Sequence, residues 1–138
     1  MLGPGAVNGL VALLGLPELF CEDGEPSAFS AVQITDATRA MVHLTTGAST
    51  GTFNVAGDGA ATIDSVAGLL GTTVHAGSRR TLVKHLEKSA RRGRPILDPD
   101  LLPLLLHRPV LANSALKSVA GFTPELSAHQ AIESWLRS

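Results

Sequence analysis

The apolar and polar positions of residues 51–71 predict a strand, a tight turn and a helix in succession. Phe53 and Val55 lie two positions apart in a β-branched and aromatic run, so their side chains point to one face of the strand. Thr62 then begins a segment whose apolar residues recur at helical spacing and which stops at Gly71. The pattern therefore predicts one β-turn-α unit with a buried side on each element.

The strand of this unit is expected at residues 52–56, and two glycines, Gly57 and Gly59, follow it. Glycine has no Cβ atom, so it can occupy positions where a larger residue would clash. We therefore expect the chain to turn back at these two positions because no side chain blocks the turn.

The residues that precede this unit are predicted to form a helix, two strands and a second helix. Asp36 stands where the second strand gives way to the second helix, and its side chain is expected to cap that helix. An ionised carboxylate also suits the positive end of a helix. The predicted elements are a helix at residues 6–14 that Pro17 ends, strands at residues 18–21 and 28–35, and a helix with Ala37, Ala40, Met41 and Leu44 on one face.

The residues that follow the unit are predicted to form a strand and then mostly helices. Ser127 and Gln130 fit the capping-box pattern, in which two side chains satisfy backbone N–H groups at the start of a helix. Pro103 interrupts a leucine-dense run, and we expect it to kink or split the helix there. The predicted elements are a strand at residues 73–76, an amphipathic helix from Arg79 to near Gly93, a helix starting at residues 98–100, an extended piece at residues 109–113 that ends in the cap residue Asn113, and a last helix with Ala131, Ile132, Trp135 and Leu136 as its packing stripe.

Composition favours a single domain over residues 1–138 and excludes several classes of protein. Of the 138 residues 44% are apolar, which is enough to supply one core. The net charge of −1 gives no general pull toward nucleic acid or a membrane surface. The one cysteine, Cys21, allows no internal disulfide, so we expect a reducing, cytoplasmic compartment and a small buried thiol. Residues 1–20 are apolar, but prolines interrupt them and no cation precedes them, so they predict neither a secretory signal nor a membrane span.

Positive charge is concentrated in the predicted helix that begins at Arg79. Seven of the chain's eleven basic residues lie between Arg79 and Arg94, while Leu82 and Leu86 supply an apolar stripe. This pattern allows three interpretations: a solvated face, an anion site for a phosphorylated substrate or cofactor, and contact with nucleic acid or a membrane. The third is the least favoured because no aromatic residues interleave the cations.

Neither a metal site nor a phosphate loop is predicted. The five histidines, His75 among them, do not recur with cysteines or carboxylates at metal-ligand spacing. Residues 3–9 read G-x-G-x-x-x-G rather than G-x-G-x-x-G, and only two residues stand before them. A strand to deliver a helix N-terminus to a pyrophosphate is therefore missing from this stretch.

Four short segments occur along the chain in an order that is typical of one enzyme family. They read MLGPG at residues 1–5, VQITDATRA at 32–40, GTFNVAGDG at 51–59 and GFTP at 121–124. Together they resemble the C-terminal half of extended short-chain dehydrogenases/reductases, the NAD-dependent epimerase/dehydratase family. The resemblance spans nearly all of the chain. It implies an α/β fold, part of a Rossmann-type structure, with about five helices and a few short strands.

The resemblance also implies what such a half would do. Family members bind the dinucleotide at a GxxGxxG turn and use a Tyr-x-x-x-Lys pair as acid and base, whereas this chain has neither that turn nor any tyrosine. We therefore expect no catalytic residues here, and NAD or NADP only where a longer chain or a partner supplies the Rossmann half. The implied function is to hold a hydroxylated small-molecule substrate, such as a nucleotide sugar, for NAD(P)-dependent epimerisation, dehydration or reduction. The alternative is a non-catalytic binding or assembly module whose leucine-dense surface meets another copy, as a homo-oligomer, or another protein.

Candidate site residues follow from the positions that match the family. The turn with Gly3 and Pro4 corresponds to the nicotinamide end of the cofactor site, and the nearby Asn8 would face the substrate. Gln33 takes the position of the family's histidine and could bond a sugar hydroxyl. The arginine that commonly pairs with a diphosphate has no counterpart at residues 26–30. The other candidates for substrate binding are Arg91, Arg92 and Arg94 at the end of the basic stretch of residues 79–94 and His107 and Arg108 at a pocket edge, and ordinary exposed polar roles remain the alternative at each.

Overall fold

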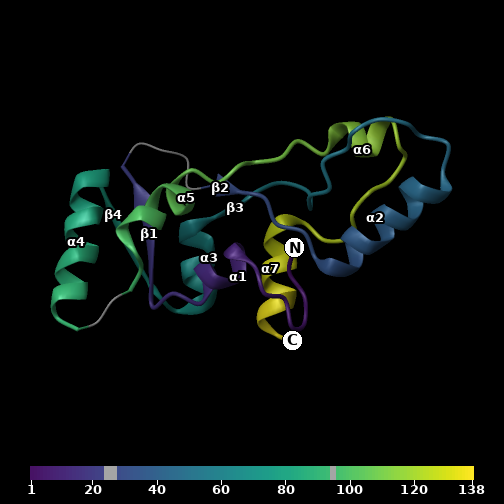
Figure 1. Ribbon diagram of the computed structural model, residues 1–138. Coiled ribbons are helices and arrows are strands. Elements are labelled where there is room, and N and C mark those ends of the chain that lie inside the picture. Colours follow the sequence, from purple (N-terminus) through teal and green to yellow (C-terminus); the bar gives the residue numbers. More distant parts are fainter. Residues whose placement is uncertain (24–27, 94–95) are drawn as a thin grey trace. The chain divides into compact units, whose positions relative to one another are not determined.

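A computed structural model of the chain describes residues 1–23, 28–93 and 96–138, and it contains helices and short strands (Figure 1). This confirms the α/β class that the hydrophobic pattern predicts. No helix within these residues has the length and apolar character that a membrane span requires. The chain divides into two compact units. The first consists of Met1–Asn8, Phe29–Ala61 and Pro109–Ser138, and the second of Gly9–Ala28 and Thr62–Arg108.

The first unit joins the N-terminal segment to the start of a long helix. Leu2 N donates to Val32 O (2.8 Å), and Ile34 N donates to Leu2 O (2.6 Å). These two bonds form a parallel bridge between Leu2 and Gln33. The N-terminal residues are therefore held beside the residue that precedes the long helix. The helices of this unit are α2 (Ile34–Thr46), α6 (Ser114–Ser118) and α7 (Ala128–Leu136).

Apolar residues from distant parts of the sequence form the core of the first unit. The prediction that Phe53 and Val55 share a buried side is confirmed, because both pack against this core. Met41 was predicted on the same helix face as the core residues and is instead 62% exposed, so that prediction is wrong. The cluster consists of Ala40, Leu116, Ala120 and Phe122, with Leu44, Phe53 and Val55 partly buried against it.

Residues 52–56 do not form the predicted strand. A strand needs a neighbour whose backbone groups face it in register. Asn54 instead uses its side chain, donating from Nδ2 to Ala112 O (3.1 Å). The β-branched and aromatic composition of this segment therefore indicates that its side chains pack, and not that its backbone enters a sheet.

The strand predicted at residues 28–35 is also shorter in the structure. Only β2 (Ala28–Phe29) is a strand, and it pairs with β3 (Ala61–Thr62). The residues after it bond to two different segments, because Ala31 O accepts from Gly57 N (2.9 Å) while Val32 O accepts from Leu2 N. Their backbone carbonyl groups are hydrogen-bonded to separate segments and not to one continuous strand, so the strand does not extend beyond Phe29.

The helix of the predicted β-turn-α unit is confirmed. α3 covers Ile63–Leu70, and Thr62 caps it in a reciprocal pair of bonds with Ser65. Gly71 ends the helix in the left-handed region (φ 65°), which glycine adopts without steric penalty. Both ends of α3 are therefore set by residues close to it in sequence.

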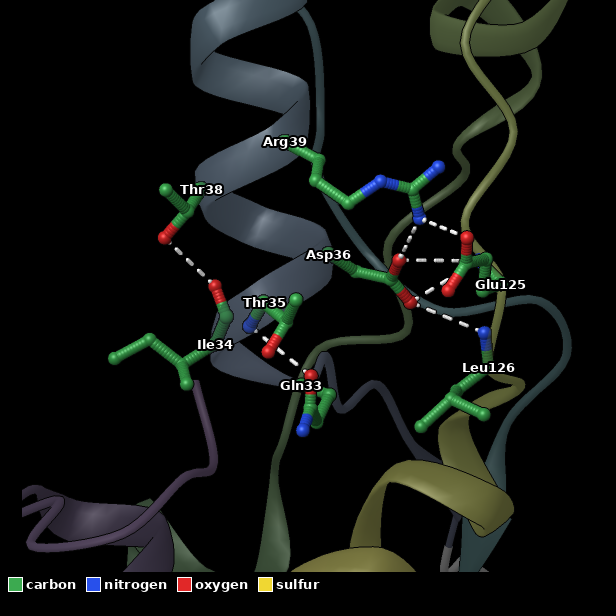
Figure 2. A network of polar contacts seen from close by, with 8 residues as sticks. All are labelled: Gln33, Ile34, Thr35, Asp36, Thr38, Arg39, Glu125 and Leu126. Carbon is green, nitrogen blue, oxygen red and sulfur yellow. Dashed lines mark hydrogen bonds and ion pairs between the residues drawn. The ribbon is translucent and has the colours of Figure 1, made fainter.

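Asp36 does not cap α2, so this prediction is wrong. The helix begins at Ile34, which makes Gln33 the cap residue. Gln33 Oε1 accepts a bond from Thr35 N (3.0 Å), as Figure 2 shows. Asp36 is thus inside the first helical turn, where its charge still suits the helix dipole but its side chain is committed elsewhere.

The buried carboxylate of Asp36 joins α2 to the segment before α7. The backbone N–H groups of Glu125 and Leu126 donate to it at 3.0–3.1 Å, and Arg39 Nη1 donates at 3.0 Å (Figure 2). Its side chain is 3% exposed, whereas Arg39 is 43% exposed. One carboxylate therefore satisfies two backbone donors across 89 and 90 positions of sequence.

Two parallel strands form the centre of the second unit. β1 (Glu18–Glu22) pairs with β4 (Thr73–Gly77), with Glu18 opposite Thr73 and Phe20 opposite His75. The strands predicted at residues 18–21 and 73–76 are therefore confirmed. α3 contacts both strands, α4 (Arg79–Arg91) contacts β4, and α5 (Leu102–Leu106) contacts β1. The remaining elements are α1 (Gly9–Leu14), which is shorter than predicted, and a 3-10 helix η1 (Pro99–Leu101).

The leucine-dense run contributes to the core of the second unit. Leu102 and Leu106 are buried there, while Leu101 is 46% exposed. Pro103 lies in the first turn of α5, directly after η1, so the run is split as predicted. The side chains of residues 104 and 105 lie outside what the structure describes. The core cluster consists of Phe20, Leu82, Leu86, Leu102 and Leu106.

The last helix of the chain confirms its predicted start but not its whole packing stripe. Ser127 and Gln130 form the expected capping box. Ile132 is fully buried, whereas Trp135 is only partly buried and Leu136 is 37% exposed. Trp135 is therefore not a core residue, because the fully buried side chains of α7 are all in its first part.

Asp58 holds the turn that follows residues 52–56. Its Oδ1 accepts a bond from Asn113 Nδ2 (2.8 Å), and Lys117 Nζ donates to Oδ2 (3.0 Å). The Asn113 bond and then the Lys117 ammonium lower the pKa of this carboxyl from its ordinary value. Asn113 occupies the cap position of α6 without making a cap bond, so its predicted capping role is replaced by this contact across the unit.

We expect the protein to lose stability in acid partly through Asp58. A carboxyl with a lower pKa in the folded chain contributes stability above about pH 4, and loses that contribution as the pH falls through its folded pKa. Asn113→Ala removes the largest cause of the lowering, so its free energy of unfolding should fall less steeply below about pH 4. Urea denaturation at several pH values measures the slopes. Asp58→Asn, which cannot titrate, should flatten the slope as well, and equal slopes in all three proteins would contradict the expectation.

Candidate functional site

Glu18, His75 and His85 bring their polar atoms together on the second unit. Glu18 Oε2 lies 2.8 Å from His85 Nε2 and 3.1 Å from His75 Nε2. The two imidazole rings are 4.2 Å apart between centroids, at an interplanar angle of 32°. The three side chains are 29–34% exposed, so solvent reaches the cluster.

The register of the two strands explains why these residues meet. Alternate residues of a strand share a face, so Glu18 lies on the same face as Phe20, and Phe20 is opposite His75. His85 is on α4, directly before the buried Leu86, and α4 lies alongside β4 (Figure 1). Two strands and one helix therefore each contribute one side chain.

An aromatic ring supports the two histidines. Phe20 is 1% exposed, and its ring centroid lies 6.0 Å from that of His75, in a stacked arrangement, and 6.2 Å from that of His85. Aromatic pairs at such distances attract each other modestly. The cluster thus packs against a buried apolar ring and is also partly exposed to solvent.

A pocket of about 310 Å³ adjoins this cluster. Residues 88, 89 and 92 follow His85 by three, four and seven positions, a spacing that places the first three on one face of α4 and Arg92 at its C-terminal end. Two cations, a hydroxyl, an imidazole and a carboxylate therefore surround one space, which suits a ligand with both anionic and hydroxyl groups. The lining residues are Glu18, His85, Lys88, Ser89 and Arg92.

The structure separates the three arginines that the sequence placed at a substrate site. Arg92 lines the pocket. Arg91 is 81% exposed and pairs with Glu87 on the next turn of α4 (3.6 Å). Arg94 lies outside the residues that the structure describes. Of the two predicted arginines that the structure describes, Arg92 lines the pocket and Arg91 does not.

His107 and Arg108 are not among the residues that line this pocket. His107 Nε2 lies 3.9 Å from Glu22 Oε2, which is a long ion-pair distance, and its side chain is 54% exposed. Burial lowers the pKa of Arg108 to about 10, so its guanidinium stays charged at neutral pH. These two residues keep their predicted role only as a hypothesis.

Gly3, Pro4, Asn8 and Gln33 belong to the first unit. A Cβ atom on Gly3 would stand 2.3 Å from the Cγ2 atom of Ile34, so this glycine allows close packing of the first turn against α2. Asn8 Nδ2 donates to Met1 O (2.7 Å), and Gln33 caps α2. The structure therefore gives Gly3, Asn8 and Gln33 local structural roles and brings Gly3 and Gln33 close together.

Sequence reasoning missed the histidine cluster and part of the pocket. The face of α4 with residues 85, 88, 89 and 92 could have been found from helical spacing alone. Glu18 and His75 give no such signal, because their proximity depends on the register between two strands. Comparison of the chain with protein-family models, with curated proteins and with solved structures found no match.

Proposed function

We propose that this chain is the substrate-binding part of an NAD(P)-dependent epimerase, dehydratase or reductase. Its substrate would be a hydroxylated small molecule that carries negative charge, such as a nucleotide sugar. The observation that carries this proposal is the pocket on α4, where Lys88, Ser89 and Arg92 face one space with Glu18 and His85. The cofactor would supply the hydride chemistry, and this chain would bind and orient the substrate.

The chemistry of the pocket suits such a ligand. Lys88 and Arg92 provide positive charge for a phosphate or carboxylate, and arginine can form two parallel bonds to one. Ser89 and the Glu18 carboxylate provide hydrogen-bonding partners for sugar hydroxyls. This arrangement supports the anion-site interpretation of the basic helix over a purely solvated face.

The first unit supports the family resemblance on which the cofactor part of the proposal rests. The MLGPG and VQITDATRA segments are neighbours in space, because Leu2 and Gln33 form a parallel bridge. These are the segments that resemble the turn after a late Rossmann strand and the strand-to-helix segment of that family. The proposal therefore combines a ligand pocket in one unit with segments in the other unit whose sequences resemble the family.

Binding measurements on two arginine variants test the proposal. UDP-glucose, GDP-mannose and dTDP-glucose are titrated into the purified chain by calorimetry, with glucose as the uncharged comparison. We expect one nucleotide sugar to bind, and Arg92→Ala to weaken it about tenfold through loss of a charge-assisted bond. Arg91→Ala, one position earlier at the last residue of α4, should change the dissociation constant less than about twofold.

Three results would count against this function. The first is that none of the three nucleotide sugars binds more tightly than glucose. The second is equal weakening by Arg91→Ala and Arg92→Ala, which would indicate a diffuse charge effect rather than a pocket. The third is that the purified chain alone binds NAD(P) and converts a nucleotide sugar, which would show that it is not a substrate-binding part only.

A further inference from the structure

We propose that Glu18, His75 and His85 bind one divalent transition-metal ion of the zinc type. Among the residues that the structure describes, these three form the group of histidine, cysteine and carboxylate side chains whose ligand atoms converge, all within 4.8 Å of one another. Nothing in the spacing of the sequence predicted such a site. The inference concerns the cluster itself and does not depend on what the neighbouring pocket binds.

The distances are close to those that a bound ion requires. Zinc lies about 2.0–2.2 Å from nitrogen and oxygen ligands, so two ligand atoms on one ion are about 3–3.5 Å apart. The Glu18 oxygen is already 2.8 and 3.1 Å from the two imidazole nitrogens. The two imidazole nitrogens lie within 4.8 Å of each other, so side-chain rotation must bring them closer before one ion contacts all three atoms.

The type of ligand selects the class of metal. Two imidazoles and one carboxylate suit Zn²⁺, Co²⁺ or Ni²⁺, whereas Mg²⁺ and Ca²⁺ prefer oxygen ligands throughout. Three protein ligands leave a coordination position for water or another small ligand. All three side chains are about one third exposed, so solvent can reach this position.

The elements that carry the ligands hold them in place. Glu18 and His75 stand on paired strands, and His85 adjoins the fully buried Leu86 on α4. The buried ring of Phe20 lies against both imidazoles. A site on such ordered elements loses little conformational freedom when the ion binds.

The surrounding charge limits the affinity. One carboxylate and two neutral imidazoles leave a net charge of +1 after a divalent ion binds, and the pocket that shares Glu18 and His85 also contains Lys88 and Arg92. Like charges nearby weaken cation binding. We therefore expect a dissociation constant on the order of micromolar rather than the much tighter binding of structural zinc sites.

The test is a titration of the purified chain with Zn²⁺ alone, followed by calorimetry, and with Co²⁺, followed by its visible absorption. We expect one ion per chain. His75→Ala, His85→Ala and the similarly sized Glu18→Gln should each weaken binding at least tenfold, with folding checked by circular dichroism. His129→Ala, which removes a histidine of α7 in the other unit, should leave the dissociation constant unchanged.

The site is refuted if the native chain binds no Zn²⁺ at about 1 mM, or if folded Glu18→Gln binds as tightly as the native chain. Equal weakening by His129→Ala would also overturn it, because binding would then not be specific to the cluster. No nucleotide sugar is present in this titration. Failure here therefore leaves the proposed substrate-binding function standing, and failure of the nucleotide-sugar test leaves the metal site standing.

Discussion

Replacing Asp36 with alanine should destabilise the protein by about 2–4 kcal/mol. The substitution leaves the partly buried N–H groups of Glu125 and Leu126 without their acceptor, and each unsatisfied donor costs about 1–2 kcal/mol. Loss of the Arg39 contact adds little, because that side chain is 43% exposed and water can solvate it. Urea denaturation measures the change in the free energy of unfolding.

Two further variants separate the buried bonds of Asp36 from its ion pair. Glu125→Ala keeps the backbone N–H group and removes only the exposed carboxylate that pairs with Arg39 (2.7 Å), so it should cost less than about 1 kcal/mol. Asp36→Asn keeps the shape but replaces one acceptor oxygen with a donor, and its cost should lie between the other two. Amide exchange at Glu125 and Leu126 should accelerate in Asp36→Ala. Similar costs for Asp36→Ala and Glu125→Ala would contradict a role for the backbone bonds.

The features that the sequence predicted correctly depend on residues close together in the chain. The capping box predicted at Ser127 involves residues three positions apart, and the predicted end of α3 needs only Gly71. The amphipathic spacing of α4 likewise follows from its own sequence. Such interactions form wherever the local pattern occurs, so they can be read without knowing the fold.

The features that the sequence did not predict depend on distant partners. Asp36 looked like a helix cap, but its carboxylate is bound by the backbone of residues 125 and 126. The strand predicted at residues 52–56 has no continuous partner, and Asn54 bonds to Ala112 through its side chain. Propensity describes how a segment could behave, while its neighbours in the fold decide how its backbone groups are satisfied.

The same distinction applies to the candidate site. Arg92 was predicted as a ligand residue. It directly follows α4 at helical spacing from His85, Lys88 and Ser89, so the spacing alone could have selected it over Arg91. Glu18 and His75 come together through the pairing of β1 with β4, and a shift of one residue in that register would send one of them to the opposite face. The histidine cluster could therefore be found only after the strand pairing was known.

Gly57→Ala should destabilise the protein by about 2–3 kcal/mol. A Cβ atom at this position would stand 2.8 Å from three backbone atoms: Ala128 N, Leu126 O and Ser127 C. Backbone atoms cannot move aside as the end of a side chain can, and Ala128 N is already held by a bond to Asp58 O (2.9 Å). The predicted clash is thus confirmed at Gly57, and thermal or urea denaturation measures its cost.

The predicted clash is wrong for Gly59, and this difference allows a matched control for Gly57. A Cβ atom on Gly59 would meet nothing within 4 Å, but the residue has φ 70°, in the left-handed region. Gly59→Ala should therefore cost about 1–2 kcal/mol, and Gly59→Asn less, because asparagine tolerates this conformation. At Gly57 asparagine should be no better than alanine, since the limit there is space and not the dihedral angle. If Gly57→Asn were clearly more stable than Gly57→Ala, the dihedral angle and not space would limit this position. That result would contradict the close approach of Gly57 to the backbone of residues 126–128.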